Sequence, residues 1–292
     1  MWNILLVIAV VIVLICLWDM LYDSNHFTVR EYSLADPRIA KDCRAVVLAD
    51  LHNKQYGKDN EQLLAAIRAC RPDMILVAGD MLTARPGRKL DPALHVLREL
   101  AKEYPIYYGN GNHEHRLTLY PDVYGDMGER YQKALDEIGI RPLVNAHVQL
   151  PEYGITVYGL QIDRSYYKRF IRQSMEAAYV ASELGAAETA DYCILLAHNP
   201  DFFEAYAAWG ADLSLAGHVH GGVARVPFWG KGVIAPSLRL FPQYDGGQFT
   251  RDGHVMIVSS GMWMHTIPVR LFNPAELVVL HLQHAEPEKT KN

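Results

Sequence analysis

Five short motifs in this 292-residue chain carry side chains that bind metal ions or move protons in other proteins. They are Asp50-Leu51-His52, Gly79-Asp80, Asn112-His113, His198 and His218-Val219-His220. Their mixture of carboxylate, imidazole and amide groups suits borderline divalent metals such as Mn, Fe or Zn, and lacks the all-oxygen character of a calcium or magnesium site. The candidate ligands are too many for one tetrahedral ion. They indicate two metal ions about 3.5 to 4 Å apart that share a carboxylate, the arrangement used for in-line attack at phosphorus.

The first two motifs directly follow segments with the pattern of a buried strand. Residues 45–49 and 74–77 are apolar runs with β-branched members, and an Asp follows each strand pattern. Residues 59–70 between them have the apolar spacing of a helix, so the three segments predict a right-handed βαβ unit. Its strands deliver Asp50 and Asp80 to the edge of the sheet where α/β folds bind their ligands.

The other motifs lie at the ends of further predicted strands. Residues two apart in extended backbone point the same way, so Asp50 with His52, and His218 with His220, are each expected to offer two ligands to one point. Strands are predicted at 106–108, 193–197, 213–216, 255–258, 267–271 and 277–282, with an antiparallel hairpin at 144–150 and 155–160. Helices are predicted at 91–103, 132–138 and 163–184.

The composition is that of a globular protein. Half of the residues are hydrophobic, 21% are charged, and the net charge of −5 argues against general nucleic-acid binding. The four cysteines, Cys16, Cys43, Cys70 and Cys193, are scattered singly and indicate neither a disulfide framework nor a zinc knuckle.

Residues 1–22 are almost entirely apolar and predict a single-pass membrane anchor, with Trp2 and Trp18 at the two interfaces. A cleaved signal peptide is the alternative, but it normally has a basic start and a small-residue cleavage site, which this segment lacks. Lys and Arg occur only after the run, which weakly favours a cytoplasmic domain and leaves the side of the membrane undetermined. We expect a polar connector at 23–43, one domain at 44–284 and a disordered tail at 285–292.

In order and spacing, the motifs Asp-x-His, Gly-Asp, Gly-Asn-His-Glu, His and Gly-His-x-His resemble those of the calcineurin-like metallophosphoesterase superfamily. The resemblance covers about residues 44–284. The anchor, the connector and the run Gly-His-Val-His-Gly-Gly-x-x-Arg-x-Pro are similar to a membrane-anchored bacterial branch, the YkuE and YaeI type. The resemblance implies an α/β fold, a two-sheet mixed β-sandwich flanked by helices, with the metal ions at strand ends.

The resemblance also implies a role for each motif residue. One metal ion would be held by Asp50, His52 and His220, the second by Asn112, His198 and His218, and Asp80 would bridge both. His113 matches the position that protonates the leaving group or steadies the phosphoryl oxygens. Glu114 and His115 either orient these groups or simply begin a helix.

The residues after Gly79-Asp80 bear on the substrate. Protein Ser/Thr phosphatases have a Val-Asp-Arg-Gly run there, whereas this chain has residues 81–85, Met-Leu-Thr-Ala-Arg, which argues against a phosphoprotein. A phosphodiester or pyrophosphate bond is predicted, and the anchor indicates a substrate at the membrane. Some relatives of this branch resemble UDP-2,3-diacylglucosamine hydrolases, which makes a nucleotide-linked lipid a candidate.

The cationic and aromatic stretch 164–172 either covers such a lipid or is a solvated helix face. Two other functions stay open: a phosphomonoesterase of broad specificity, and a non-catalytic phosphoesterase-like scaffold. A scaffold of this kind usually lacks one or more ligands, and here every motif is complete.

Overall fold

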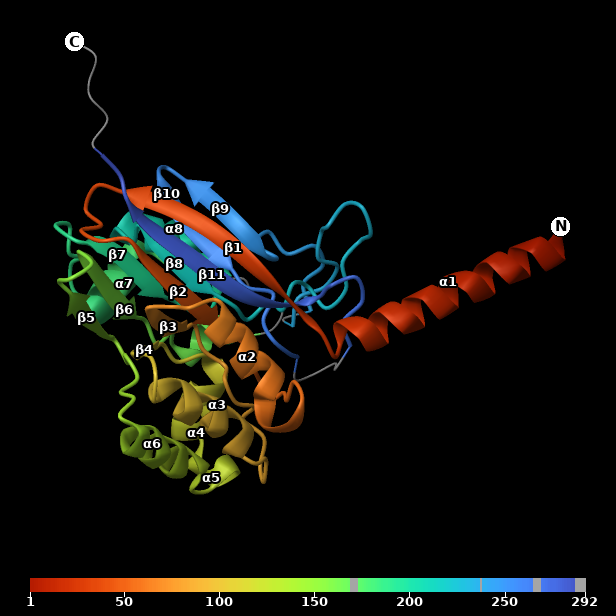
Figure 1. The fold of residues 1–292 in the computed structure, drawn as a ribbon, viewed down its shortest axis with the longest axis horizontal. Helices are drawn as coiled ribbons and strands as arrows, with labels where there is room; N and C mark the ends of the chain where they lie inside the picture. Colours follow the sequence, from red (N-terminus) through yellow and green to blue (C-terminus); the bar gives the residue numbers. More distant parts are fainter. Residues whose placement is uncertain (169–172, 237, 265–268, 287–292) are drawn as a thin grey trace, which may run out of the picture.

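The computed structural model describes residues 1–168, 173–236, 238–264 and 269–286, which contain two mixed β-sheets packed face to face with helices outside them (Figure 1). The first sheet has the order β1 (Phe27–Asp36), β11 (Ala275–His284), β2 (Cys43–Leu48), β3 (Met74–Val77), β4 (Ile106–Tyr108). The second has the order β5 (Ala146–Leu150), β6 (Ile155–Gly159), β7 (Tyr192–Leu196), β8 (Leu213–Ala216), β10 (His254–Val258), β9 (Gly247–Arg251). The predicted two-sheet fold is confirmed.

The predicted βαβ unit is present as β2, α2 (Glu61–Ala69) and β3. The two strands pair in parallel, from Ala45 opposite Met74 to Leu48 opposite Val77. Alternate residues of β2 pack in opposite directions, Val46 toward the helices and Val47 toward the second sheet. Because both faces are covered, the strands are apolar throughout, which is why their sequences lack the polar alternation of an exposed sheet.

Helices cover the outer face of each sheet. On the first they are α2, α3 (Asp91–Ala101) and α6 (Met127–Ile138), and on the second α7 (Ala177–Leu184) and α8 (Phe203–Trp209). The shorter helices α4 (Asn112–Leu119) and α5 (Pro121–Tyr124) follow β4, and one-turn 3₁₀ helices lie at η1 (Lys58–Asn60), η2 (Arg164–Tyr167) and η3 (Pro200–Phe202).

Two predictions of elements need correction. The continuous helix predicted at 163–184 is wrong, because η2 ends where Lys168 takes an extended conformation, and α7 begins only at Ala177; residues 169–172 lie outside the described residues. The strand predicted at 267–271 is not seen at 269–271, where only Leu271 forms an isolated bridge with Ala224, and residues 267–268 are not described.

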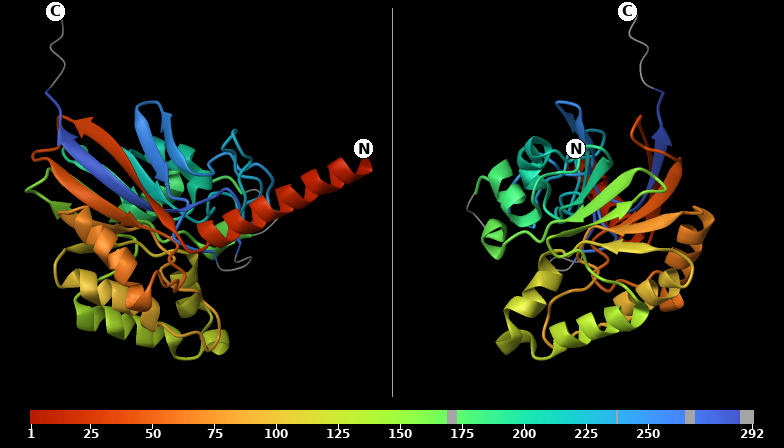
Figure 2. Two further views of the ribbon diagram at one scale, coloured as in Figure 1. Left: turned by 45° about the vertical axis from the view of Figure 1, so that its right-hand side comes forward. Right: turned by 90° about the vertical axis from the view of Figure 1, so that its left-hand side faces the viewer.

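The helix α1 (Trp2–Asp23) projects away from the sheets (Figures 1 and 2). Its 22 residues reach about 33 Å at 1.5 Å per residue, and its apolar side chains are exposed, with a mean hydropathy of 3.1 over the best window. By length and composition it can cross a bilayer, a test that a signal sequence also passes.

The segment 23–43, predicted as a polar connector, contains strand β1. All ten residues of β1 pair in parallel with β11, so this segment is part of the folded unit. Of the tail predicted to be disordered at 285–292, residues 287–292 lie outside the described residues.

Candidate metal centre

The loops that leave five neighbouring strands bring the predicted motifs to one place. Asp50 and His52 follow β2, and Asp80 follows β3. Asn112 and His113 begin α4 just after β4. His198 follows β7, and His218 and His220 follow β8, so the two sheets contribute to one cluster.

The backbone that presents these residues is not extended. The prediction that extended backbone would point Asp50 and His52, and likewise His218 and His220, in the same direction was therefore wrong. Positive φ angles occur at Asp50 (52°), His52 (48°), Asp80 (56°), His218 (67°) and His220 (51°). A left-handed conformation costs a residue with a side chain roughly 1 kcal/mol or more. Five such residues in one cluster mark a site where the fold holds side chains in place at the expense of local strain.

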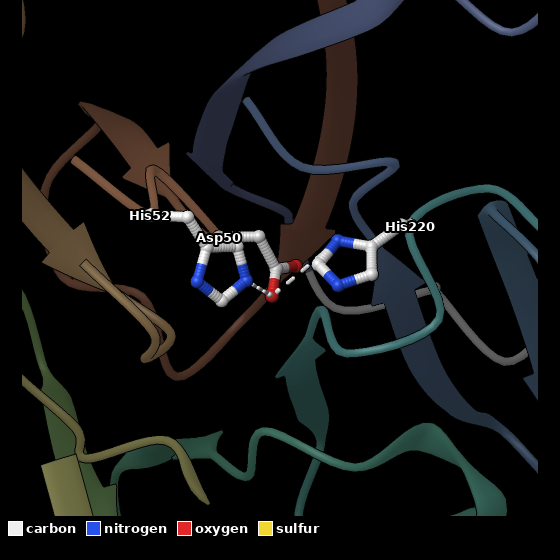
Figure 3. A group of neighbouring side chains, drawn as sticks. All are labelled: Asp50, His52 and His220. Atoms are coloured by element: carbon white, nitrogen blue, oxygen red, sulfur yellow. Dashed lines mark ion pairs between the residues drawn. The ribbon is translucent and has the colours of Figure 1, made fainter. Parts of the chain in front are cut away.

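Asp50 is the centre of the first group of candidate ligands (Figure 3). Its Oδ1 lies 3.6 Å from His52 Nε2 and 3.7 Å from His220 Nδ1. The other oxygen, Oδ2, accepts a hydrogen bond of 2.9 Å from the backbone N–H of His218. All three side chains of the group are buried, and their ligand atoms lie within 4.8 Å of one another.

Asp80 lies between this group and a second one. Its Oδ2 is 3.0 Å from His198 Nε2 and 3.9 Å from His52 Nε2, while its Oδ1 accepts a 2.8 Å hydrogen bond from the His113 N–H. Burial raises the pKa of Asp80, but the imidazoles around it, His198 foremost, outweigh burial and hold this pKa well below its usual value. Asp80, His198 and His218 form a second group whose ligand atoms lie within 4.8 Å.

The donor atoms fit divalent cations. Among the described residues, neither Asp50 Oδ1 nor Asn112 Oδ1 has a hydrogen-bond partner, although both atoms are buried. An oxygen in that position is costly unless a cation satisfies it. The Nδ1 of His198 donates to the Ala78 carbonyl at 2.7 Å, so it is the Nε2 that faces the carboxylates and that would bind a cation after losing its proton.

His113 enters the cluster with a defined tautomer. The backbone N–H of Ala84 donates to His113 Nδ1 at 2.8 Å, so the hydrogen of the neutral ring is on Nε2. This Nε2 lies 4.0 Å from Asp80 Oδ2. His113 therefore points an N–H, and not a lone pair, toward the candidate ligands.

Glu114, for which the sequence left two interpretations open, fastens two of the loops together. Its carboxylate accepts hydrogen bonds from the N–H groups of Asp80 (2.9 Å), Met81 (2.8 Å) and Gly111 (3.0 Å). Burial, followed by the nearby charge of Asp80, raises its pKa to about 7. No sequence pattern indicates this role of Glu114, because its hydrogen-bond donors are backbone N–H groups and not particular side chains.

Two glycines make room for the carboxylates. A Cβ on Gly111 would lie 2.2 Å from Asp80 Oδ1, and one on Gly217 would lie 2.3 Å from Asp50 Oδ2. The motifs therefore need Gly at these positions because the loop backbones approach the Asp side chains closely.

One aromatic residue outside the five motifs also lies at the site. Tyr167, in η2, packs edge-on against His218 with ring centroids 5.0 Å apart. It belongs to the cationic and aromatic stretch 164–172, whose described part thus lies beside the cluster; residues 169–172 are not described.

Comparison with known proteins identifies the family. Residues 43–222, more than half of the chain, match the model described as calcineurin-like phosphoesterase. The chain belongs to the calcineurin-like phosphoesterase family. The predicted family is thereby confirmed.

Two curated relatives that this chain resembles are named as uncharacterized metallophosphoesterases. One from Campylobacter jejuni is 26% identical over 87% of this chain, and the chain spans 63% of that relative's length. YkuE of Bacillus subtilis is 24% identical over 82% of this chain and 79% of its own length.

The chain also has distant matches among solved structures. A NAD nucleotidase from Haemophilus influenzae has 15% identity and a TM-score of 0.41 over 75% of this chain and 45% of its own. A purple acid phosphatase from yellow lupin has 11% identity and a TM-score of 0.38 over 88% of this chain and 58% of its own.

Proposed function

We propose that this protein hydrolyses a phosphoric ester or anhydride with the help of two divalent metal ions. In this proposal Asp50, His52 and His220 hold one ion, Asn112, His198 and His218 hold the other, and Asp80 bridges them. The observation that carries it is the position of Asp80 Oδ2, which lies within 4.0 Å of imidazole nitrogens from both groups. The mixed oxygen and nitrogen donors suit Mn, Fe or Zn.

Two bound cations would supply Lewis acidity at the phosphoryl group and a water molecule of lowered pKa. The chain's own contribution is to hold the donor atoms rigidly, since each Asp has one oxygen fixed by a backbone N–H and the other turned toward the imidazoles. His113 offers its Nε2–H to a phosphoryl or leaving-group oxygen. The hydrogen bond from Ala84 supports donation over full proton transfer, because loss of the Nε2 proton would leave an anionic ring.

We further propose a phosphodiester or pyrophosphate substrate, carried by a lipid at the membrane. Support comes from α1, whose end is bonded to the segment that backs the metal centre. Asp23 accepts a 2.7 Å hydrogen bond from the Asn273 N–H, and the Asn273 side chain donates to the His220 carbonyl at 2.8 Å. A substrate embedded in the bilayer would reach a site held this close to the anchor.

The experiment that tests the hydrolase is turnover of a chromogenic phosphodiester and of the matching phosphomonoester by the full chain in detergent micelles. Metal would be added as Mn or removed by chelation, and Asp80→Asn is the control variant. We expect Mn-dependent turnover that favours the diester, and loss of both turnover and bound metal in Asp80→Asn.

Other outcomes lead to different conclusions. Preference for the monoester would establish a phosphomonoesterase and contradict the proposed substrate class. Two bound metal ions without turnover of either compound would support the scaffold. An Asp80→Asn variant that keeps its metal and its activity would contradict the bridging role.

A further inference from the structure

The loop of residues 223–246, here called the aromatic loop, turns large apolar side chains outward; residue 237 is outside its described part. At its tip, Phe228 is fully exposed and Trp229 is 71% exposed. Leu238, Leu240 and Phe241 add to the same exposed group. Soluble loops expose small and polar residues, so an apolar tip of this kind marks a surface that contacts something apolar.

Polar groups inside the aromatic loop hold it in a fixed shape. The Arg225 guanidinium donates to the carbonyls of Gly221 (3.2 Å), Gly230 (3.0 Å) and Asp245 (2.9 Å). The Val226 N–H donates to the Lys231 carbonyl at 2.9 Å and closes a turn with Phe228 and Trp229 at its end. The aromatic rings are therefore exposed by a framework of hydrogen bonds.

The aromatic loop lies on the side of the molecule from which α1 projects (Figures 1 and 2). One short segment, residues 271–273, joins the two. The Arg225 N–H donates to the Leu271 carbonyl at 2.9 Å, and the N–H of Phe272 donates to Asp19 in α1 at 2.5 Å. The orientation of α1 is therefore linked to that of the loop, and Asn273 links both to His220.

The chemistry of the loop selects its partner. The Lys231 Nζ lies 3.4 Å from Asp245 Oδ2, and the Arg239 Nη1 lies 2.5 Å from Asp201 Oδ2. These two cations of the aromatic loop therefore have carboxylate partners. What remains at the tip is Phe and Trp, which favour the boundary between lipid headgroups and acyl chains. With an apolar helix of bilayer length fixed beside it, the apolar surface within reach is the bilayer.

We propose that the aromatic loop inserts Phe228 and Trp229 into the same lipid bilayer that holds α1, so that the metal centre faces the membrane surface. This contact is apolar, and it needs no anionic lipid. It goes beyond the proposed hydrolase activity and is measured without turnover, so failure of either proposal leaves the other standing.

The test places a fluorescent label on the loop of the full chain in phosphatidylcholine nanodiscs. Cys43 and Cys193 are buried, so a Cys16→Ser, Cys70→Ser background leaves a single accessible position for an environment-sensitive dye. The dye is attached in Trp229→Cys and, as the matched control, in Val123→Cys. Val123 is 54% exposed, and its helix α5 lies away from α1 (Figure 1). Bromine on the lipid acyl chains should quench the label at 229 roughly twofold or more over that at 123.

Equal and weak quenching at both positions, with both labels open to aqueous iodide, would overturn the proposal. A label at 229 shielded from iodide but not quenched by bromine would indicate a protein partner and would overturn it as well. A second measurement avoids the label altogether: brominated lipid should quench the native chain more than a Trp229→Phe variant, which keeps the Trp residues of α1, the buried Trp209 and the partly exposed Trp263. Quenching that is unchanged in this variant would contradict the insertion.

Discussion

Each of the two central carboxylates divides its oxygens between the backbone and the imidazoles. Asp50 and Asp80 each accept one backbone N–H and direct the second oxygen toward histidines 3.0 to 4.0 Å away. The side chains are therefore oriented before any ligand arrives, which removes part of the entropic cost of binding one. At the scale of single residues, the site is built by amide groups that no motif records.

His113 gives the first prediction at this scale. His113→Ala should slow turnover by roughly 10² to 10⁴ while the metal content is unchanged. Because the ring acts as a donor through Nε2, His113→Gln, which also carries an N–H, should recover part of that loss. The measurement is kcat with nitrophenyl and alkyl leaving groups, and a donor predicts a similar loss for both. A much larger loss for the alkyl group would instead show that His113 transfers its proton.

The protonation of His198 gives the second. Burial lowers the pKa of this ring, but the carboxylates of Asp80 and Asp50 outweigh it and raise the pKa to about 10. The ring is therefore cationic at neutral pH, with a proton on Nε2 as well as on Nδ1. A metal ion must displace the Nε2 proton, so metal affinity should rise with pH, by up to about tenfold per unit. Calorimetric titration with Mn in two buffers of different ionisation enthalpy measures the released protons. Equal affinity at about pH 6 and about pH 8 would contradict this.

Sequence could name the candidate ligands, but it could not show how their side chains are held in place. The types and order of Asp50, Asp80 and the histidines predicted the cluster that the structure brings together. The positive φ angles were missed because they arise from the packing of loops against one another, as at Gly111 and Asp80. The tautomer of His113 depends on Ala84, a residue whose side chain gives no sign of it.

At the scale of elements, Glu114 joins the turn after β3 to the start of α4. Glu114→Ala would leave buried N–H groups of Asp80 and Met81 without an acceptor, and should lower the free energy of unfolding by about 3 kcal/mol. The measurement is urea denaturation, with metal affinity as a second readout. Glu137→Ala on the exposed face of α6 is the control and should change the free energy by under about 0.5 kcal/mol. An equal effect of both would remove Glu114 from this role.

The elements that sequence predicted best have a clear apolar pattern. The strands of the βαβ unit are apolar runs that are buried on both faces, whereas the edge strand β5 is largely exposed, and its hairpin with β6 follows from alternation. The stretch 163–184 was mistaken for a helix because its aromatic residues pack in different directions and not along one helix face. Tyr166 packs against Tyr179 and Phe202, whereas Tyr167 packs against His218. The connector became a strand because β11 offers β1 a partner almost 250 residues away along the chain.

At the scale of the whole molecule, α1 and the folded unit share hydrogen bonds. Phe272 and Asn273 donate backbone N–H groups to Asp19 and Asp23. A soluble fragment that begins at Asp19 should therefore be more stable than one that begins at Phe27, by about 1 to 2 kcal/mol. Denaturation of the two fragments checks this, and Asp23→Ala in the longer fragment should remove most of the difference. Identical stability would show that these contacts do not matter to the fold.

The order β1-β11-β2 places a strand from near residue 280 between two strands from the first 50 residues. During synthesis, β2 lacks this neighbour until about 230 residues after its own end have been made, which takes roughly 10 to 45 s at 5 to 20 residues per second. Over that interval the loop with Asp50 has no complete sheet behind it. Newly made chains should therefore bind metal ions at the candidate centre only after β11 has been made and paired, as a late and all-or-none event.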